Sequence, residues 1–177
     1  MENANGFLNP EEILKQIDIR NNMHIADFGC GNGYFSIPMA KIADQGLVYA
    51  FDVIKDSLEV VNSKAKLDDI SNIETVHCNL ENLNGSKLND ESVDLVLLRN
   101  ILFQSQKKSE IIKETKRVLK NGNRLVVVEW IKDSSLAPKD GWLISKEEVQ
   151  QLIKMEGFDL EKELEMDKHH YGLVFRK

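Results

Sequence analysis

The amino-acid sequence predicts an α/β protein with three layers, in which a mostly parallel β-sheet is covered by helices on both faces. Short apolar runs that suit buried strands alternate with segments whose apolar residues recur at helical spacing. Parallel neighbours in a sheet need crossover connections, and the intervening helices provide them. Only a few polar residues separate the last two strand-like segments, as in a hairpin. We therefore expect seven strands, with the last one antiparallel.

The strands follow from apolar runs bounded by polar or turn residues. In chain order they are residues 23–28, 47–51, 73–78, 93–98, 124–130, 158–164 and 169–176. The run over 124–130 is nearly continuous, which is typical of a strand covered on both faces. The last two segments form the expected hairpin.

The helices follow from capping residues and from the spacing of apolar side chains. In chain order they lie near residues 9–18, 35–46, 56–65, 105–120 and 145–157. Asn9, followed by Pro10, is expected to cap the first helix, and Asp56 and Ser145 the third and the last. The side chains expected on buried helix faces are Phe35, Met39, Ile42, Leu58, Val61, Ala65, Ile111, Ile112, Thr115, Val118, Leu119, Val149, Leu152 and Ile153.

The composition suits one globular domain with a substantial core, since 42% of the 177 residues are hydrophobic. The formal net charge of −6 gives no general attraction to nucleic acid or to an anionic membrane. No apolar run approaches the roughly 20 residues of a membrane span. We expect a cytoplasmic protein without nucleic-acid or membrane partners. Cys30 and Cys78 lack metal-binding spacing, so we expect reduced thiols and no bound metal.

The functional interpretation centres on residues 25–35, an apolar strand that leads into Gly29, Gly31 and Gly33. Glycines at alternate positions allow a tight bend and bring backbone N–H groups close to a ligand. In a sheet of this kind, ligands bind beyond the carboxyl ends of the strands, where the strand order reverses. The loop is expected at that place, which indicates a nucleotide-cofactor site.

The positions of the residues around the loop narrow the class of cofactor. A dinucleotide fingerprint needs a third glycine where this chain has Tyr34 or Ser36. The carboxylate of Asp27 would repel a pyrophosphate but could receive an ammonium group. Asp52, 19 residues after Gly33 and at a strand end, could accept both hydroxyls of a ribose. We therefore expect a nucleoside that carries an amino acid.

Five stretches match a known family in order, namely residues 26–33, 48–52, 73–81, 92–100 and 117–125. This ordered set resembles the class I S-adenosylmethionine-dependent methyltransferases, and the resemblance covers about residue 10 to the end. It implies a small Rossmann-like methyltransferase domain over residues 21–177, with residues 1–20 as a helical cover segment. It also implies S-adenosyl-L-methionine as the cofactor and S-adenosyl-L-homocysteine as the product.

The resemblance assigns roles within the cofactor site. Asp27 and the loop backbone would hold the methionine moiety, Asp52 the ribose, and Asn79 with Leu80 the adenine, while Arg99 would lie near the sulfonium. The full implied set is Asp27, Phe28, Gly29, Cys30, Gly31, Gly33, Tyr34, Asp52, Val53, Asn79, Leu80 and Arg99. The family commonly has Asp where this chain has Asn79, whose amide oxygen can accept the same hydrogen bond without charge-assisted strength. Cys30 receives no catalytic role.

Methyl transfer mainly requires that the acceptor be held in line behind the methyl group. No residue stands out in the sequence as a general base. Residues 99–104 lack the Asp/Asn-Pro-Pro-aromatic signature of the methyltransferases that act on exocyclic or amide nitrogens. Features of magnesium-dependent catechol and arsenite enzymes are missing as well. We expect a small, partly apolar acceptor under a cover made by residues 1–18 and 131–145. The acceptor-contact candidates are Asn100, Phe103, Gln104, Trp130 and Trp142.

Other interpretations stay open. A module that binds the cofactor without turnover would fit Asn79 and the missing base, and a nicotinamide dehydrogenase would bind NAD, with the misplaced glycine against it. The tryptophans and Phe103 could be core residues instead of a substrate wall. His169 and His170, adjacent on a strand, should point to opposite faces and not share a metal, with one packed and one solvated.

Overall fold

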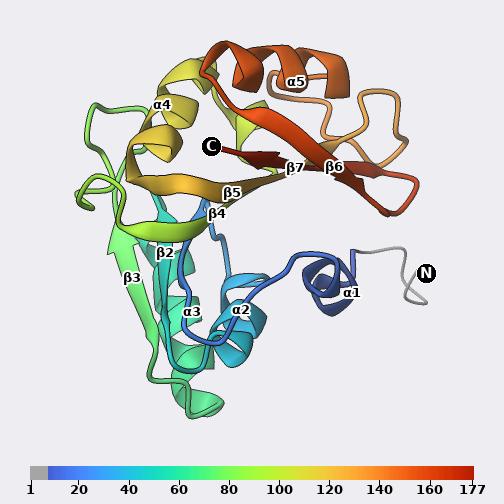
Figure 1. Ribbon diagram of the computed structural model, residues 1–177. Helices are drawn as coiled ribbons and strands as arrows, with labels where there is room; N and C mark the ends of the chain where they lie inside the picture. The colour runs from blue at the N-terminus through green and yellow to red at the C-terminus, as the bar shows by residue number, and fades with distance from the viewer. Residues whose placement is uncertain (1–7) are drawn as a thin grey trace.

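One seven-stranded sheet runs through the computed structural model, which describes residues 8–177 (Figure 1). The strands are β1 (His24–Phe28), β2 (Leu47–Asp52), β3 (Ile73–His77), β4 (Val93–Arg99), β5 (Leu119–Trp130), β6 (Asp159–Leu164) and β7 (His170–Arg176). Their spatial order is β3-β2-β1-β4-β5-β7-β6. The neighbours from β3 to β5 pair in parallel, and β7 pairs antiparallel with both β5 and β6. The predicted fold class, including an antiparallel last strand, is confirmed.

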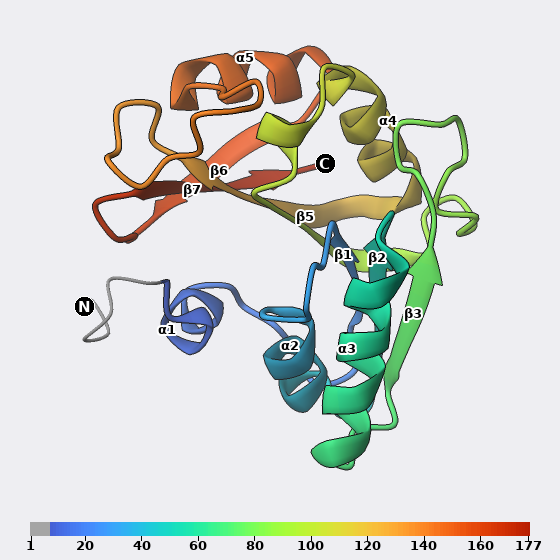
Figure 2. The same ribbon diagram turned by 180° about the vertical axis from the view of Figure 1, so that it is seen from behind.

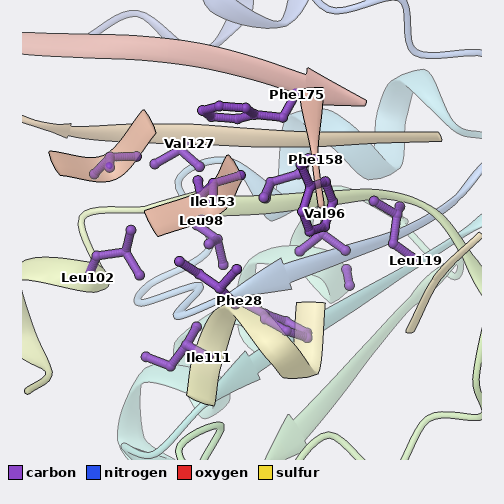
Figure 3. Packing of buried hydrophobic residues seen from close by; sticks show 14 of the residues in the cluster. Phe28, Val96, Leu98, Leu102, Ile111, Leu119, Val127, Ile153, Phe158 and Phe175 are labelled. Carbon is purple, nitrogen blue, oxygen red and sulfur yellow. The ribbon is translucent and has the colours of Figure 1, made fainter. Parts of the chain in front are cut away.

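Helices cover both faces of this sheet (Figures 1 and 2). They are α1 (Pro10–Lys15), α2 (Ser36–Ile42), α3 (Lys55–Leu67), α4 (Lys108–Val118) and α5 (Lys146–Met155), together with a short 3₁₀ turn, η1 (Leu102–Gln104). The helices α1 to α3 lie on one side of the sheet and α4 and α5 on the other. Figure 3 shows the apolar packing on the second side, where Phe28 and Leu98 of the sheet meet Ile111 of α4 and Ile153 of α5.

The strand order reverses beside β1, which pairs with β2 on one side and with β4 on the other. Phe28, the last residue of β1, lies opposite Phe51 and Leu98 in the sheet register. The three strands therefore end at the same level. This level edge brings Gly29, Asp52 and Arg99 together, although they are far apart in the sequence.

Two predicted helix starts are confirmed by their hydrogen bonds. The side chain of Asn9 accepts from the N–H of Glu11, with Pro10 at the first helical position. Ser145 and Glu148 form a reciprocal capping box, in which each side chain accepts from the backbone N–H of the other. Each cap satisfies helix N–H groups that would otherwise have no intrahelical partner.

Other sequence predictions about these elements are wrong. Asp56 does not cap α3, because Asp52 accepts from the N–H of Ile54 at the helix start and Asp56 falls within the first turn. Helix α4 ends at Val118, and β5 already begins at Leu119, where the chain turns extended and pairs with Val93. The side chain of Ile42 is exposed because it is the last residue of α2.

Candidate functional site

A cavity of about 620 Å³ lies at the carboxyl ends of β1, β2 and β4. Its lining comes from the glycine loop, from the segments after β2, β3 and β4, and from the helices α3 and α4. The lining residues are Gly29, Cys30, Gly31, Asn32, Tyr34, Asp52, Val53, Ile54, Ser57, Lys64, Cys78, Asn79, Leu80, Glu81, Arg99, Asn100, Ile101, Gln104, Ser105 and Ile111. This is the edge of the sheet at which the sequence predicts a ligand.

The glycine loop presents bare backbone to this cavity. Gly29, Gly31 and Gly33 all have positive φ angles, of 78°, 50° and 75°, a region that side chains rarely adopt. A Cβ atom at Gly29 would lie 2.9 Å from Ile101, and one at Gly33 would lie 3.0 Å from Val61. Nothing lies within 4 Å of the corresponding position at Gly31. Gly31 is therefore where a ligand can approach the loop most closely.

Asp52 links the loop to the start of α3. Its Oδ2 accepts the N–H of Gly31 at 2.8 Å, and its Oδ1 accepts the N–H of Ile54 at 2.9 Å. Each carboxylate oxygen has two acceptor positions. Each oxygen thus retains one position for a ligand hydroxyl at the cavity wall, which fits a ribose.

Asp27 lies deeper than Asp52. It is 2% exposed and is not among the lining residues, nor are Phe28 and Gly33. Burial raises the pKa of this carboxyl to about 6, against the lowering effect of the hydroxyl donated by Ser36 and of the nearby Arg99 charge. Asp27 is therefore a buried carboxyl close to the loop, with a pKa about one unit below neutral pH.

Arg99 brings a half-buried cation to the cavity. Its guanidinium carbon lies 5.4 Å from the ring centroid of Tyr34 and 5.6 Å from that of Phe35. Burial lowers the pKa of this group, and Asp27 partly offsets the shift. Within residues 8–177 its Nε has no hydrogen-bond partner. The arrangement can hold an anionic group, such as the carboxylate of an amino acid.

The predicted adenine end has a different chemistry from the loop. Asn79 is exposed, and its Oδ1 already accepts the N–H of Glu81 at 2.8 Å. A carbonyl oxygen has a second acceptor position, so the expected bond to an adenine amino group is compatible with this geometry. Leu80 is buried beside it, and Val53 is largely exposed.

The two thiols are not activated. Cys30 and Cys78 are free cysteines. Burial raises the pKa of both thiols, that of Cys78 to about 11, and nearby carboxylates raise the pKa of Cys30 further. Since the thiolate is the nucleophile, neither group has the character of a reactive cysteine.

The structure brings together two of the five acceptor-contact candidates. Asn100 and Gln104 line the cavity next to Arg99, whereas Phe103 and Trp130 are half-buried and are not part of the lining. Trp142 is 48% exposed and lines a separate hollow of about 410 Å³ against α5. It is neither a core residue nor part of the wall.

The predicted cover is only partly described. Residues 1–7 lie outside the described part of the chain, and residues 8–18 and 131–145 do not line the cavity. The nearest link is the Tyr34 hydroxyl, which donates to the carbonyl of Leu8. In residues 8–177 no three His, Cys, Asp or Glu side chains are grouped so as to hold a metal ion.

Several lining residues are not among the site residues predicted from the sequence. They are Asn32, Ile54, Ser57, Lys64, Cys78, Glu81, Ile101, Ser105 and Ile111. Lys64, for example, donates to the carbonyl of Asn32 at 2.8 Å from the middle of α3. Only the fold shows that this lysine reaches the loop. Asn32 lies inside the predicted loop, so its position in the sequence could have suggested that it lines the cavity.

The expectation that one of His169 and His170 is solvated is wrong, because both are 6% exposed. His170 packs against Trp130, with ring centroids 3.9 Å apart. His169 is covered by the segment after β5, where its Nδ1 lies 2.7 Å from the Ser134 hydroxyl.

Comparison with known proteins agrees with the architecture. The family model described as a methyltransferase domain matches residues 19–173. The chain belongs to this methyltransferase family. A demethylmenaquinone methyltransferase from Listeria welshimeri is 29% identical over 133 residues, which are 75% of this chain and 53% of that protein. The matched part of the chain thus spans about half the length of this relative.

Solved structures share the fold. A SAM-dependent methyltransferase from Aquifex aeolicus has a TM-score of 0.83 at 23% identity, with 95% of this chain and 89% of that chain covered. The [4+2]-cyclase SpnF has a TM-score of 0.82 at 15% identity, with 95% and 79% covered. At these identities the likeness concerns the fold alone. No helix in residues 8–177 of this methyltransferase family member is both long and apolar enough to span a membrane.

Proposed function

We propose that this chain transfers a methyl group from S-adenosylmethionine to a small, partly apolar molecule. The observation that carries the proposal is the meeting of Gly31, Asp52 and Arg99 at one cavity, on the level edge of β1, β2 and β4. The open backbone at Gly31 allows a ligand to approach closely, the carboxylate of Asp52 has unused acceptor positions for a ribose, and the half-buried cation of Arg99 can pair with an amino-acid carboxylate.

The chain's own residues would hold the cofactor and position the acceptor. Bound S-adenosylmethionine would supply an electrophilic methyl group, which the acceptor takes as the carbon–sulfur bond breaks. Asp52 would bind the ribose and the segment at Asn79 and Leu80 the adenine, while Asp27 would favour the ammonium group electrostatically. Residues 21–177 would form the cofactor domain. The apolar side chains of Ile101 and Ile111 on the cavity wall would help to exclude water from the acceptor.

The relative's name suggests the first acceptor to test. A demethylmenaquinone methyltransferase shares 29% identity with this chain, so the quinone in its name is the first compound to test. An electrophilic methyl group needs an electron-rich acceptor, so the reduced quinol form is the appropriate compound. Asn100 and Gln104 offer polar groups beside the apolar wall, as such a ring would require. We also keep the proposal of a cytoplasmic protein without nucleic-acid partners, on the basis of its acidic charge.

Calorimetry with S-adenosylmethionine and S-adenosylhomocysteine tests the cofactor assignment. We expect both to bind, and Asp52→Ala to weaken binding by roughly tenfold or more, because the ribose contacts and the anchor of Gly31 are lost together. Asp56→Ala, an exposed carboxylate in α3, is the matched control and should bind as the wild type does. Unchanged binding by Asp52→Ala, or no binding by folded wild type, would contradict the proposal.

A second candidate is a cofactor-binding module that transfers no methyl group. The cavity lining favours this candidate, because within residues 8–177 it offers no free carboxylate as a general base. Its carboxylates are those of Asp52 and Glu81, and both accept hydrogen bonds from the protein. The fold also occurs in a cyclase. Incubation with cell extract and labelled S-adenosylmethionine separates the two candidates. Binding without any labelled product would favour the module.

A further inference from the structure

A buried polar chain runs from the turn before β7 to the wall of the cavity. The Nδ1 of His170 lies 3.1 Å and 3.2 Å from the two carboxylate oxygens of Asp167, and its Nε2 lies 3.4 Å from Nδ2 of Asn100. The His170 and Asp167 side chains are 5% and 7% exposed. Only Asn100 of the three lines the cavity. We call these residues the Asp167–His170–Asn100 chain.

The partners of Asp167 determine which ring nitrogen of His170 carries hydrogen. Its Oδ1 also accepts the backbone N–H groups of His169 and His170, each at 2.8 Å. Burial alone would raise the pKa of this carboxyl, but these donors outweigh it and the pKa lies below its ordinary value. An ionised carboxylate only accepts hydrogen bonds. The hydrogen therefore resides on Nδ1 of His170.

The ring of His170 in turn determines the orientation of the Asn100 amide. Burial lowers the pKa of His170 more than Asp167 raises it, and Arg99 on β4 and the adjacent His169 lower it further, while β5 contributes the uncharged Trp130. A neutral ring protonated on Nδ1 has a lone pair on Nε2, which accepts a hydrogen bond. Of the two ends of the Asn100 amide, only the nitrogen can donate this bond. The amide oxygen is then left without a partner in residues 8–177.

The backbone of Asn100 is held as firmly as its side chain. Its φ angle is 51°, which is uncommon for a residue other than glycine. Its N–H donates to the carbonyl of Val128 at 2.8 Å, and its carbonyl accepts from Gln104 at 2.6 Å. Buried polar groups are nearly always paired, and strained backbone gathers at functional sites. An amide fixed in this way, with a buried and unpaired oxygen on a residue that lines the cavity, therefore points to a ligand contact.

We propose that Asp167 and His170 are positioning residues that orient the Asn100 amide, so that its oxygen accepts a hydrogen bond from an O–H or N–H group beside the methyl-accepting atom. This inference rests on the proposed methyl transfer and deepens it by selecting a class of acceptor. A hydroxylated aromatic ring meets the requirement, whereas a molecule with only ether or thioether groups does not.

Protonation of His170 would reverse the arrangement. An imidazolium donates from both nitrogens, so the Asn100 amide would turn its oxygen toward the ring and its nitrogen toward the acceptor. The hydrogen bond to the acceptor would then be lost. Turnover of the acceptor should fall at acid pH with the titration of His170, while binding of the cofactor should not follow that titration.

The kinetic test compares His170→Gln and Asp167→Asn with wild type, using S-adenosylmethionine and demethylmenaquinol kept reduced. With S-adenosylmethionine at saturating concentration, we expect kcat/KM for the quinol to fall by roughly tenfold, the factor for one neutral hydrogen bond, and the part of its acid limb that His170 causes to disappear. S-adenosylhomocysteine affinity should stay within about twofold. His169→Gln is the matched control, because His169 is equally buried but bonds to Ser134. It should change neither quantity.

Nitrogen NMR of labelled histidine gives a readout that needs no turnover. Near neutral pH we expect His170 to be protonated on Nδ1 and unprotonated on Nε2, and the Asn100 side-chain amide to shift with the His170 titration. A ring protonated on Nε2, or variants with wild-type kcat/KM, would overturn the positioning role. The expected tautomer in a wild type that binds S-adenosylhomocysteine but methylates nothing would instead overturn the proposed methyl transfer.

Discussion

At the scale of the residue, Asp27 has a proposed role in cofactor binding, and its burial comes at the expense of stability. Its carboxyl is buried at the foot of the glycine loop, and burial raises its pKa from 3.8 to about 6. The folded protein therefore binds the proton more tightly than the unfolded chain does. Stability falls as the pH rises from about 4 to about 6, and the loss is complete above that range. At neutral pH, folding buries the ionised carboxylate of Asp27, and this burial lowers the stability of the folded protein.

We therefore predict that Asp27→Asn stabilises the protein at neutral pH. The gain in unfolding free energy should be up to about 3 kcal/mol above pH 7 and small near pH 4, because the amide does not titrate. Binding of S-adenosylhomocysteine should weaken, since the charge beside the loop is lost. Urea unfolding at both pH values and calorimetry measure the two effects. The exposed Asp44→Asn serves as control, and equal stability changes at both pH values would contradict the argument.

At the scale of the element, the glycine loop allows the cost of a left-handed backbone to be distinguished from the effect of ligand contact. Gly31 has a left-handed backbone with open space around it, and Gly122, at the far end of β5, has the same two properties. Alanine at either position should cost about 1 kcal/mol of stability through the left-handed conformation alone. Only at Gly31 does the open space belong to the cavity.

The prediction is that Gly31→Ala and Gly122→Ala destabilise the protein to a similar extent, but that only Gly31→Ala weakens binding of S-adenosylhomocysteine, by about tenfold or more. Thermal unfolding and calorimetry on the two variants give the comparison. Gly29→Ala should be the least stable of the three, because its Cβ would press on Ile101 at 2.9 Å. Equal ligand affinity in the Gly31 and Gly122 variants would show that the loop backbone does not meet the ligand.

Element boundaries were less predictable than element types. Periodicity identifies α4, but the switch from helix to strand at Leu119 depends on its pairing with Val93, which no local pattern contains. The start of α3 is held by Asp52, a residue that the sequence assigns to the ligand alone. In both places a tertiary contact overrides the local signal.

At the scale of the whole molecule, the sequence predicts the residues of the loop but not what surrounds them. Gly31, Asp52 and Asn79 follow strands in a recognisable spacing, so their meeting at the sheet edge could be foreseen. Lys64 at the cavity, and the contact of Asp167 and His170 with Asn100, could not be foreseen, because helix packing and the hairpin bring these side chains together from distant positions. Trp142 was chosen for its residue type, yet the loop that carries it turns toward α5.

Helix α1 extends this long-range support to the turn that carries Asp167. The side chain of Gln16 donates to the carbonyl of Glu165 at 3.0 Å and accepts its N–H at 2.8 Å, across 149 positions of sequence. Two such bonds clamp the first helix to the β6–β7 turn. Both bonds are solvent-exposed, so water can replace the lost side chain, and their removal costs about 1 kcal/mol.

Gln16→Ala should therefore lower the unfolding free energy by about 1 kcal/mol and speed hydrogen exchange at the Glu165 amide, while the central strand β1 keeps its protection relative to global unfolding. Gln45→Ala, an exposed glutamine after α2, is the matched control. If the turn also steadies Asp167, the variant should lose part of the acceptor kcat/KM without a change in cofactor affinity. Wild-type exchange at Glu165 would show that α1 does not hold the turn, and that His170 depends on the hairpin alone.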